Sequence, residues 1–156
     1  MARTTSDAVK WSAGTLLQYE RLEESYQLWL RVETLLLDLD DDDDASPTGI
    51  EAHRLASETN DRYMVDAHLF LVAASQLVKT LEELDRRDLL PLLPAEHITH
   101  ARNAMEHDDE RGLYQRDYRG YRWTIGGTEG MHSIYGVRVA PVVEGLRAVA
   151  AALGTP

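Results

Sequence analysis

The feature that most constrains the fold is a stripe of apolar residues between positions 67 and 84, separated by alternating steps of three and four. This spacing places the side chains on one face of an α-helix, because the helix turns once every ~3.6 residues. A helix with one apolar face must bury that face against other helices, as in a helical bundle. The members of the stripe are Ala67, Phe70, Ala74, Leu77, Leu81 and Leu84. The pattern predicts a helix that begins at Asp61 or, with Pro47 in its first turn, as early as Ser46.

Another helix is expected near the start of the chain. Apolar residues follow a helical spacing from Thr5 to Leu37, and Ser6 or Asp7 can cap its first turn. The same stretch can instead form two helices broken near Gly14, since glycine disfavours a helix interior. The residues expected near its buried face are Leu16, Tyr19, Leu22, Tyr26, Trp29 and Leu37.

The second half of the chain predicts two further helices. Residues 89–94 contain two prolines, so this run is expected to be a buried apolar connector and not a regular helix. A helix from Pro94 to Glu110 follows, and the last helix begins at Pro141 and ends at Gly154. The last helix is expected to bury Val142, Leu146, Val149 and Leu153.

The segments 121–125 and 133–139 flank a glycine-rich run before the last helix, which predicts a β-hairpin or an ordered loop. With 156 residues, the chain is long enough for one well-packed core. The sequence therefore predicts a single all-α domain over residues 1–156. Its expected architecture is an up-and-down bundle of four to five helices, with the hairpin or loop before the last helix.

Composition excludes several classes of protein. The chain has no cysteine, so disulfides, thiolate nucleophiles and thiolate zinc sites are excluded. No window approaches the ~18 consecutive apolar residues of a membrane span, and the N-terminal residues lack a signal-peptide core. We therefore expect a cytoplasmic protein with no membrane partner. The net charge of −11 argues against a protein that is a nucleic-acid binder over its whole surface.

The predicted helix from Pro94 to Glu110 contains the run Arg102-Asn103-Ala104-Met105-Glu106-His107. Helical phase places Thr99, Arg102, Asn103, Glu106, His107 and Glu110 on one arc, and Ile98, Ala101, Ala104 and Met105 on the other. At a spacing of four, Glu106 is a partner for Arg102, and Asn103 is a partner for His107. The simplest interpretation is a surface ion pair beside a solvated histidine. The alternative is a site in which imidazole moves a proton and guanidinium holds a phosphate.

This run resembles the Arg-x4-6-His motif of the HEPN superfamily of small helical bundle proteins, many of which are metal-independent endoribonucleases. The resemblance includes the polar residue after the arginine, Asn103, and the position of the motif after a long stripe-bearing helix. It implies a homodimer in which both motifs face one composite cleft, with no cofactor and no metal. It also implies an RNA substrate, a toxin-antitoxin or defence setting, and an antitoxin or nucleotidyltransferase as a partner protein.

Carried over to this chain, the resemblance makes His107 the general base or acid at the ribose 2′-hydroxyl and the leaving oxygen, and Arg102 the ligand of the scissile phosphate. Asn103 orients the imidazole or the phosphate, and Glu106 holds Arg102 in place. Some HEPN toxins carry a tyrosine two residues after the histidine, where a nucleotidyltransferase modifies them. Asp109 occupies that position here. A non-catalytic HEPN-like module, in which Arg102 and His107 stabilise a dimer, is the alternative function.

Arginine and aromatic residues alternate directly after the motif. This mixture suits single-stranded RNA, because guanidinium groups bind phosphates and aromatic rings stack on bases. A loop packed on the bundle, or a protein interface, has a similar composition. The residues predicted to contact RNA are Arg111, Arg116, Tyr118, Arg119, Tyr121 and Arg122.

Three weaker patterns complete the set of candidate sites. The acidic run Asp40–Asp44 partly matches a calcium-binding loop, but Ala45 replaces the required glycine, so a solvated loop is the better interpretation. His97 and His100 are spaced to share a metal, yet no matching carboxylate motif accompanies them. His68, on the apolar helix, is expected to be a core histidine whose hydrogen bonds are satisfied.

Overall fold

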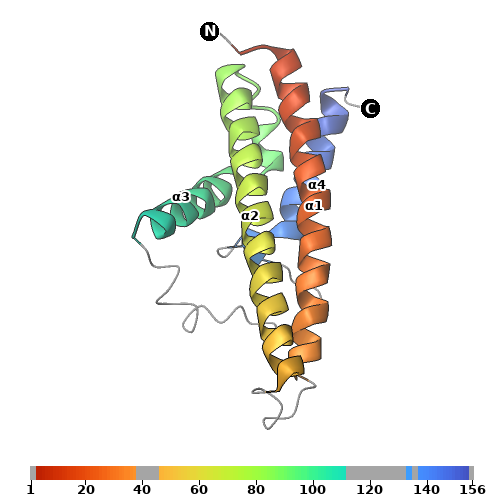
Figure 1. Cartoon of the computed structure of the whole chain (residues 1–156). Helices are drawn as coiled ribbons and strands as arrows, with labels where there is room; N and C mark the ends of the chain where they lie inside the picture. Colours follow the sequence, from red (N-terminus) through yellow and green to blue (C-terminus); the bar gives the residue numbers. More distant parts are fainter. Residues whose placement is uncertain (1–2, 38–45, 112–132, 135–136, 155–156) are drawn as a thin grey trace. The chain divides into compact units, whose positions relative to one another are not determined.

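The computed structural model describes residues 3–37, 46–111, 133–134 and 137–154. It confirms the all-α helical class (Figure 1). The elements in chain order are α1 (Thr5–Leu37), α2 (Pro47–Glu83), the short 3₁₀ helix η2 (Leu90–Leu92), α3 (Ala95–Arg111), β1 (Ser133–Ile134), β2 (Val137–Arg138) and α4 (Val139–Ala152). The chain divides into two compact units: unit 1 comprises Met1–Leu16 and Leu71–Pro156, and unit 2 comprises Leu17–Phe70. The expected single domain stays a prediction.

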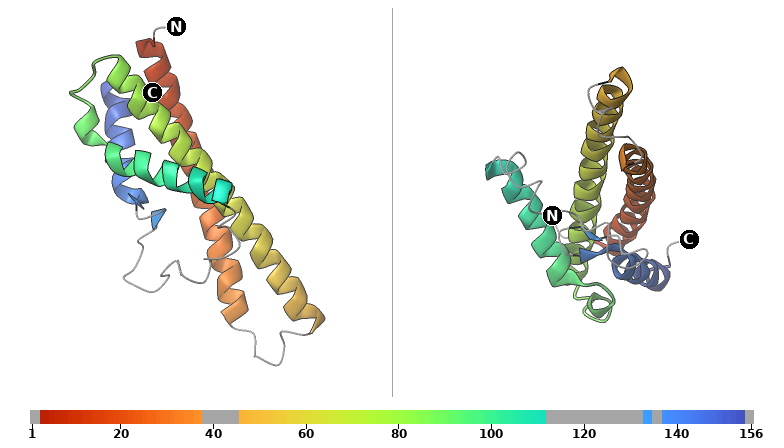
Figure 2. Two further views of the ribbon diagram at one scale, coloured as in Figure 1. Left: turned by 90° about the vertical axis from the view of Figure 1, so that its left-hand side faces the viewer. Right: turned by 90° about the horizontal axis from the view of Figure 1, so that it is seen from below.

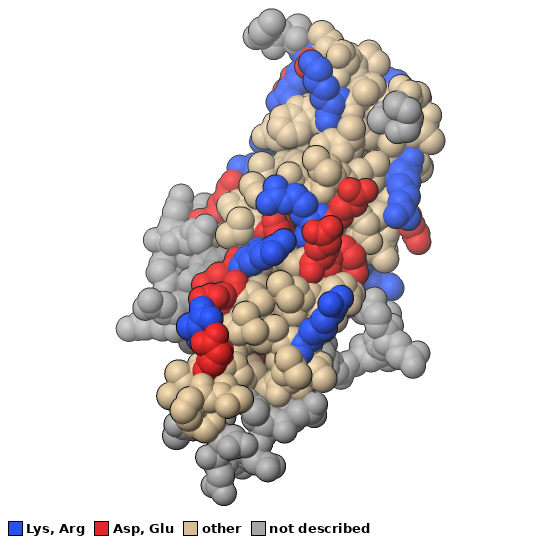
Figure 3. Space-filling model, turned by 45° about the vertical axis from the view of Figure 1, so that its right-hand side comes forward, with Lys and Arg blue, Asp and Glu red and all other residues tan. Residues whose placement is uncertain are grey.

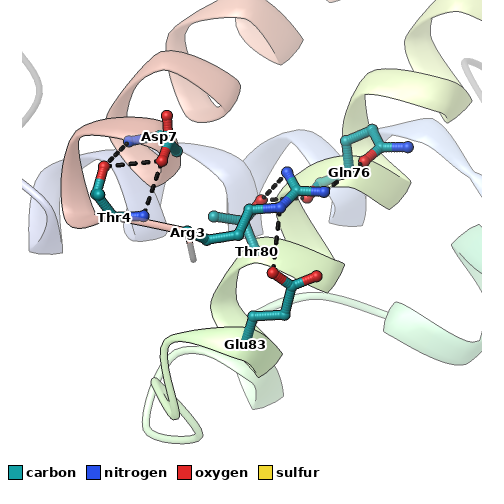
Figure 4. Close-up of polar contacts among 6 residues, drawn as sticks. All are labelled: Arg3, Thr4, Asp7, Gln76, Thr80 and Glu83. Carbon is teal, nitrogen blue, oxygen red and sulfur yellow. Dashed lines mark hydrogen bonds and ion pairs between the residues drawn. The ribbon is translucent and has the colours of Figure 1, made fainter. Parts of the chain in front are cut away.

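The first turn of α1 is fixed by a capping box, and the capping residue is Thr4, not the expected Ser6 or Asp7. Asp7 N–H donates to Thr4 Oγ1 at 3.3 Å, and the Thr4 backbone N–H donates to Asp7 Oδ2 at 2.8 Å (Figure 4). The Thr4 hydroxyl also donates to Asp7 Oδ2, at 2.8 Å. These hydrogen bonds from Thr4 hold the pKa of the Asp7 carboxyl below its ordinary value. Because α1 is continuous through Gly14, the alternative of two broken helices is wrong.

The residue before this cap joins the start of the chain to the end of α2 within unit 1. Arg3 Nη1 donates to Thr80 Oγ1 at 2.8 Å, and Nη2 donates to Gln76 Oε1 at 3.1 Å (Figure 4). Arg3 Nε lies 3.3 Å from Glu83 Oε2. Residues 76, 80 and 83 lie on one face of α2, because they are separated by four and three positions. The Arg3 guanidinium therefore contacts all three side chains.

In unit 2, α1 and α2 lie side by side and antiparallel, as both views in Figure 2 show. The ring centroids of Trp29 and Tyr63 are 5.6 Å apart and the rings stack at 11°. Tyr26 lies 5.7 Å from Tyr63, and Tyr19 lies 6.3 Å from Phe70. Partial burial, and then the charge of a nearby glutamate, raise the pKa of the Tyr26 hydroxyl. Aromatic contacts between the two helices therefore dominate the core of this unit.

Buried positions recur every seven residues on both long helices. On α1 they are Ala8, Thr15, Leu22 and Trp29, and on α2 they are Gly49, Ala56, Tyr63, Phe70 and Leu77. A seven-residue repeat keeps one strip of each helix facing its neighbour over many turns. Of the face expected on α1, Leu22 and Trp29 are buried, Leu16, Tyr19 and Tyr26 are half-exposed, and the Leu37 side chain lies outside the description.

Unit 1 buries α2 much more completely. In this unit the expected stripe is buried at Ala74, Leu77 and Leu81, whereas Leu84 follows the helix end and is half-exposed. The first two stripe residues, Ala67 and Phe70, are buried in unit 2. From Leu71 to Leu81 the helix also buries residues beside the stripe, including Ser75 and Thr80. The helix begins at Pro47, which supports the longer of the two predicted starts.

The connector between α2 and α3 is only partly buried. Leu89 and Leu93 are buried, whereas Pro91 and Leu92 are exposed, which corrects the expectation of a wholly buried run. The 3₁₀ helix covers only Leu90–Leu92, and Leu93 after it is extended, so the run is not one regular element with a single buried face. α4 packs on this turn, and a Cβ placed on Gly145 would lie 2.0 Å from the Leu92 carbonyl oxygen. Gly145 is therefore required for this close approach.

The segment 133–139 is not one strand. β1 pairs with β2 in an antiparallel register, with Ser133 opposite Arg138 and Ile134 opposite Val137. Alternation of apolar and polar residues does not show where a strand reverses, so the sequence pattern did not separate these two strands. The other expected strand, residues 121–125, lies outside the described residues. α4 begins at Val139, two residues before the expected start, and buries Val142, Leu146 and Val149, but Leu153 is half-exposed.

Within the described residues, one helix is long and apolar enough to cross a membrane, namely α2. Most of its apolar window is buried inside the structure. A core helix meets the same two criteria, so this feature is weak support for a membrane span.

Candidate functional site

The rotation of α3 is set by its apolar face. Ile98, Ala101 and Met105 are buried, as expected, whereas Ala104 is half-exposed and lies at the edge of that face. The helix follows Pro94, whose carbonyl oxygen accepts a hydrogen bond from Ile98 N–H at 3.0 Å. This packing places Arg102 at the border between buried and exposed surface, about 70° around the helix from the buried centre.

Arg102 and Glu106 form the ion pair expected from their spacing. Arg102 Nε donates to Glu106 Oε1 at 2.9 Å, and Nη2 donates to the same oxygen at 2.5 Å. The two side chains are 22% and 36% exposed. Partial shielding from water strengthens such a pair compared with a fully solvated one. Glu106 thus orients the guanidinium, while the N–H groups of Nη1 are not used by this pair.

His107 follows Glu106 in α3, so it belongs to the same rigid element as Arg102. Their positions differ by about 140° around the helix axis. The side chains of residues 107–111 lie outside the description, and with them the expected contact between His107 and Asn103. Asn103 itself is exposed. The structure therefore brings together Arg102 and Glu106 from the predicted catalytic set.

Most of the predicted RNA-contacting segment lies outside the described residues. Arg111 is the last residue of α3, and its side chain is not described. Arg116, Tyr118, Arg119, Tyr121 and Arg122 lie outside the described residues, as does the acidic run Asp40–Asp44. The RNA path along this segment stays a prediction.

The histidines that sequence analysis singled out lie on α2 and α3. His97 and His100 are exposed on α3, and the described part of the chain contains no group of three or more metal-ligating side chains. His68 is half-buried on α2, and its Nε2 is buried without a hydrogen-bond partner among the described residues. The expectation of a fully satisfied histidine is therefore wrong.

Sequence analysis missed a buried carboxylate in unit 2. The Asp66 side chain is only 3% exposed, and its Oδ1 lies 3.4 Å from Arg21 Nη2. Arg62 Nε lies 3.9 Å from Asp66 Oδ2. The four-residue spacing of Arg62 and Asp66 was a readable signal. The contact of Arg21 with Asp66 could not be read from the sequence, because it depends on how α1 aligns with α2.

Charged side chains of both signs are interleaved on the face drawn in Figure 3, with uncharged surface between them. On α2, Arg54 pairs with both Glu51 and Glu58. Comparison of the chain with protein-family models, curated proteins and solved structures found no match. The function therefore has to be argued from the residues themselves.

Proposed function

We propose that this protein is a metal-independent endoribonuclease whose catalytic element is the Arg102–His107 segment of α3. The observation that carries the proposal is the partly shielded Arg102 guanidinium, which Glu106 orients through two hydrogen bonds. An arginine held in this way keeps donors for a phosphate, and a histidine lies five residues further along the same helix. The HEPN-like motif gives the same assignment.

In the proposed reaction, His107 removes the proton from a ribose 2′-hydroxyl, and the 2′ oxygen attacks the adjacent phosphorus. Arg102 stabilises the negative charge that develops on the phosphate oxygens. The bond to the 5′ oxygen breaks, and this oxygen leaves with a proton from the general acid. The products are a 2′,3′-cyclic phosphate and a 5′-hydroxyl end. In the composite cleft of a dimer, the second His107 supplies the acid.

The proposal extends to a cytoplasmic toxin or defence setting, with an antitoxin or nucleotidyltransferase as the protein partner. These assignments rest on the resemblance of the motif and not on the geometry.

The test is cleavage of single-stranded RNA by the wild type and by His107→Ala, with and without EDTA. Loss of general acid–base catalysis is expected to lower the rate about a hundredfold to ten-thousandfold, with cyclic phosphate ends in the wild type only. EDTA should leave the rate unchanged. His100→Ala is the matched control, because His100 is an exposed histidine on the same helix. Equal cleavage by His107→Ala and His100→Ala would rule the proposal out.

A non-catalytic interaction module is the second candidate, and one observation favours it. Glu106 already neutralises part of the Arg102 charge, as in an ordinary surface ion pair. Glu106→Gln separates the two functions. If Glu106 only orients a catalytic arginine, this variant loses cleavage and keeps its oligomeric state. If the pair supports an interface, sedimentation shows a change and RNA stays intact in every sample.

A further inference from the structure

The outward face of α1 in unit 2 carries a second set of residues with coiled-coil spacing. Successive members are separated by four, three, four, three and four positions, and every member is exposed. We call this set the outer seam: Leu17, Arg21, Glu24, Leu28, Arg31 and Leu35. Its leucines are 56%, 36% and 61% exposed in chain order. Three exposed leucines thus lie on one strip of the helix, with charged residues between them.

The same stretch of α1 already has an inner seam, which is buried. Leu22, Ser25, Trp29 and Val32 follow the three-and-four spacing, and the Trp29 ring stacks on Tyr63 of α2. A helix with two such seams is built for two neighbours. α2 is the neighbour of the inner seam, and no described residue of unit 2 covers the outer one.

The sequence of the outer seam is complementary to itself when two copies run antiparallel. With a two-fold axis beside positions 22 and 23, Leu17 lies opposite the partner's Leu28, and Arg21 lies opposite the partner's Glu24. The axis repeats each contact, so the interface contains two leucine pairs and two ion pairs. We propose that the outer seam is the docking surface for a second copy of this chain. This proposal does not depend on ribonuclease activity.

Charge selects this register over the neighbouring one. A shift of one heptad places Leu17 opposite the partner's Leu35, but it also places Arg21 opposite the partner's Arg31. Like charges at facing positions of a helix pair are destabilising. Arg21 also forms an ion pair within its own chain, because its Nη2 lies 3.4 Å from the buried Asp66 carboxylate. That contact uses one nitrogen and leaves Nε and Nη1 available to face a glutamate.

Oligomeric state tests the interface on the full chain. The wild type should sediment as a dimer. Leu17→Lys and Leu28→Glu should each raise the dimer dissociation constant roughly a hundredfold, since the axis places each buried charge at two sites. An equimolar mixture should recover the dimer, because lysine at 17 then faces glutamate at 28 across one contact. Val65→Lys is the matched control, since Val65 is 58% exposed and lies on α2.

Circular dichroism confirms that each variant folds, as expected for substitutions at exposed positions. A monomeric wild type, or a Leu17→Lys variant that dimerises as tightly as Val65→Lys, would overturn the proposal.

The absence of cysteine allows a second test of register. Leu17→Cys/Leu28→Cys should form covalent dimers on oxidation, whereas Leu17→Cys/Leu35→Cys should form far fewer. The reverse result would show that the like-charged register is used and would refute the proposed pairing. A cleavage assay on the same samples keeps this outcome separate from that of the proposed activity.

Discussion

In unit 2, α2 buries a narrow strip against α1, whereas in unit 1 the same helix buries side chains around most of its circumference. Between residues 47 and 62 only Gly49, Ala56 and Thr59 are buried. Residues 71 to 81 bury most of theirs, and the majority are small or aliphatic. Seven of the eight large apolar side chains that are exposed in the described residues belong to unit 2. One helix can therefore serve as a hairpin arm and as a core helix.

The two units therefore depend on different interactions. Unit 2 relies on a few large aromatic contacts and one buried carboxylate. Unit 1 relies on close packing of small residues, as at Gly145 against the Leu92 carbonyl. Substitutions that create cavities should therefore be most harmful in unit 2, and those that add volume should be most harmful in unit 1.

The largest effect is expected for Trp29→Ala in unit 2. Removal of a buried ring that stacks on Tyr63 should lower the free energy of unfolding by about 3–5 kcal/mol, as for other large aromatic residues in cores. Urea denaturation measures this change. Leu55→Ala, at an exposed position of α2 in the same unit and outside the outer seam, is the control. A loss for Trp29→Ala no larger than that of the control would show that the aromatic contacts do not hold this unit.

Gly145→Ala should be the next most harmful change, and it acts on unit 1. The added Cβ would lie 2.0 Å from a backbone oxygen, which forces α4 and η2 apart at a cost of about 2–3 kcal/mol. Gly14→Ala is the matched control, because no atom lies within 4 Å of its Cβ. Alanine there should instead stabilise α1 by up to about 1 kcal/mol. Thermal unfolding distinguishes these opposite signs, and equal effects would disprove the close approach.

Arg21→Ala should lower the free energy of unfolding by about 1–2 kcal/mol. In this variant the buried Asp66 keeps only Arg62, which lies further away than Arg21. Asp66→Leu should change stability much less, since the two arginines are half-exposed and can be hydrated when the carboxylate is absent. Denaturation is measured in the Leu17→Lys background, so that dimer dissociation does not contribute. A larger loss for Asp66→Leu than for Arg21→Ala would contradict this asymmetry.

The smallest effect is expected at the cap of α1. Thr4→Ala should reduce stability by about 1 kcal/mol at neutral pH, the usual cost of a lost capping residue. The folded-state pKa of Asp7 lies below its unfolded value of 3.8, so its contribution is present above that value and is lost as the pH falls through the folded pKa. Thr4→Ala should move this pKa upward towards 3.8, which an NMR titration of the carboxyl carbon measures. An unchanged Asp7 pKa would show that Thr4 does not lower it.

Local patterns predicted most of the fold, because helices form from nearby residues. The stripe from Ala67 to Leu81 and the extent of α1 were readable from spacing alone. The inner strip of α1 was only partly readable, because Thr15 and Ser25 are buried members that a search for apolar residues omits. Their hydroxyls donate to backbone carbonyls one turn earlier, so helix geometry offsets their polarity.

In the candidate site, too, contacts within one helix could be predicted, whereas contacts between helices could not. The Arg102–Glu106 pair was predicted because four-residue spacing fixes it within one helix. The contact between Arg21 and Asp66 was not, because it depends on the alignment of two helices that are distant in sequence. Nor was it readable that His68 Nε2 has no hydrogen-bond partner among the described residues, since this depends on tertiary packing.

The seven-residue repeat shared by α1 and α2 makes the length of their hairpin adjustable in fixed steps. Seven residues make about two turns of helix, so removing seven from each arm returns every later side chain to nearly its original direction. Positions 22 and 29 of α1, and 56 and 63 of α2, mark such equivalent levels. The two shortened helices should still pack against each other through the same faces. Deletion of one residue from one helix would instead rotate the rest of that helix by about 100°. The length of the hairpin can thus change in steps of seven residues while the contacts in its core stay the same.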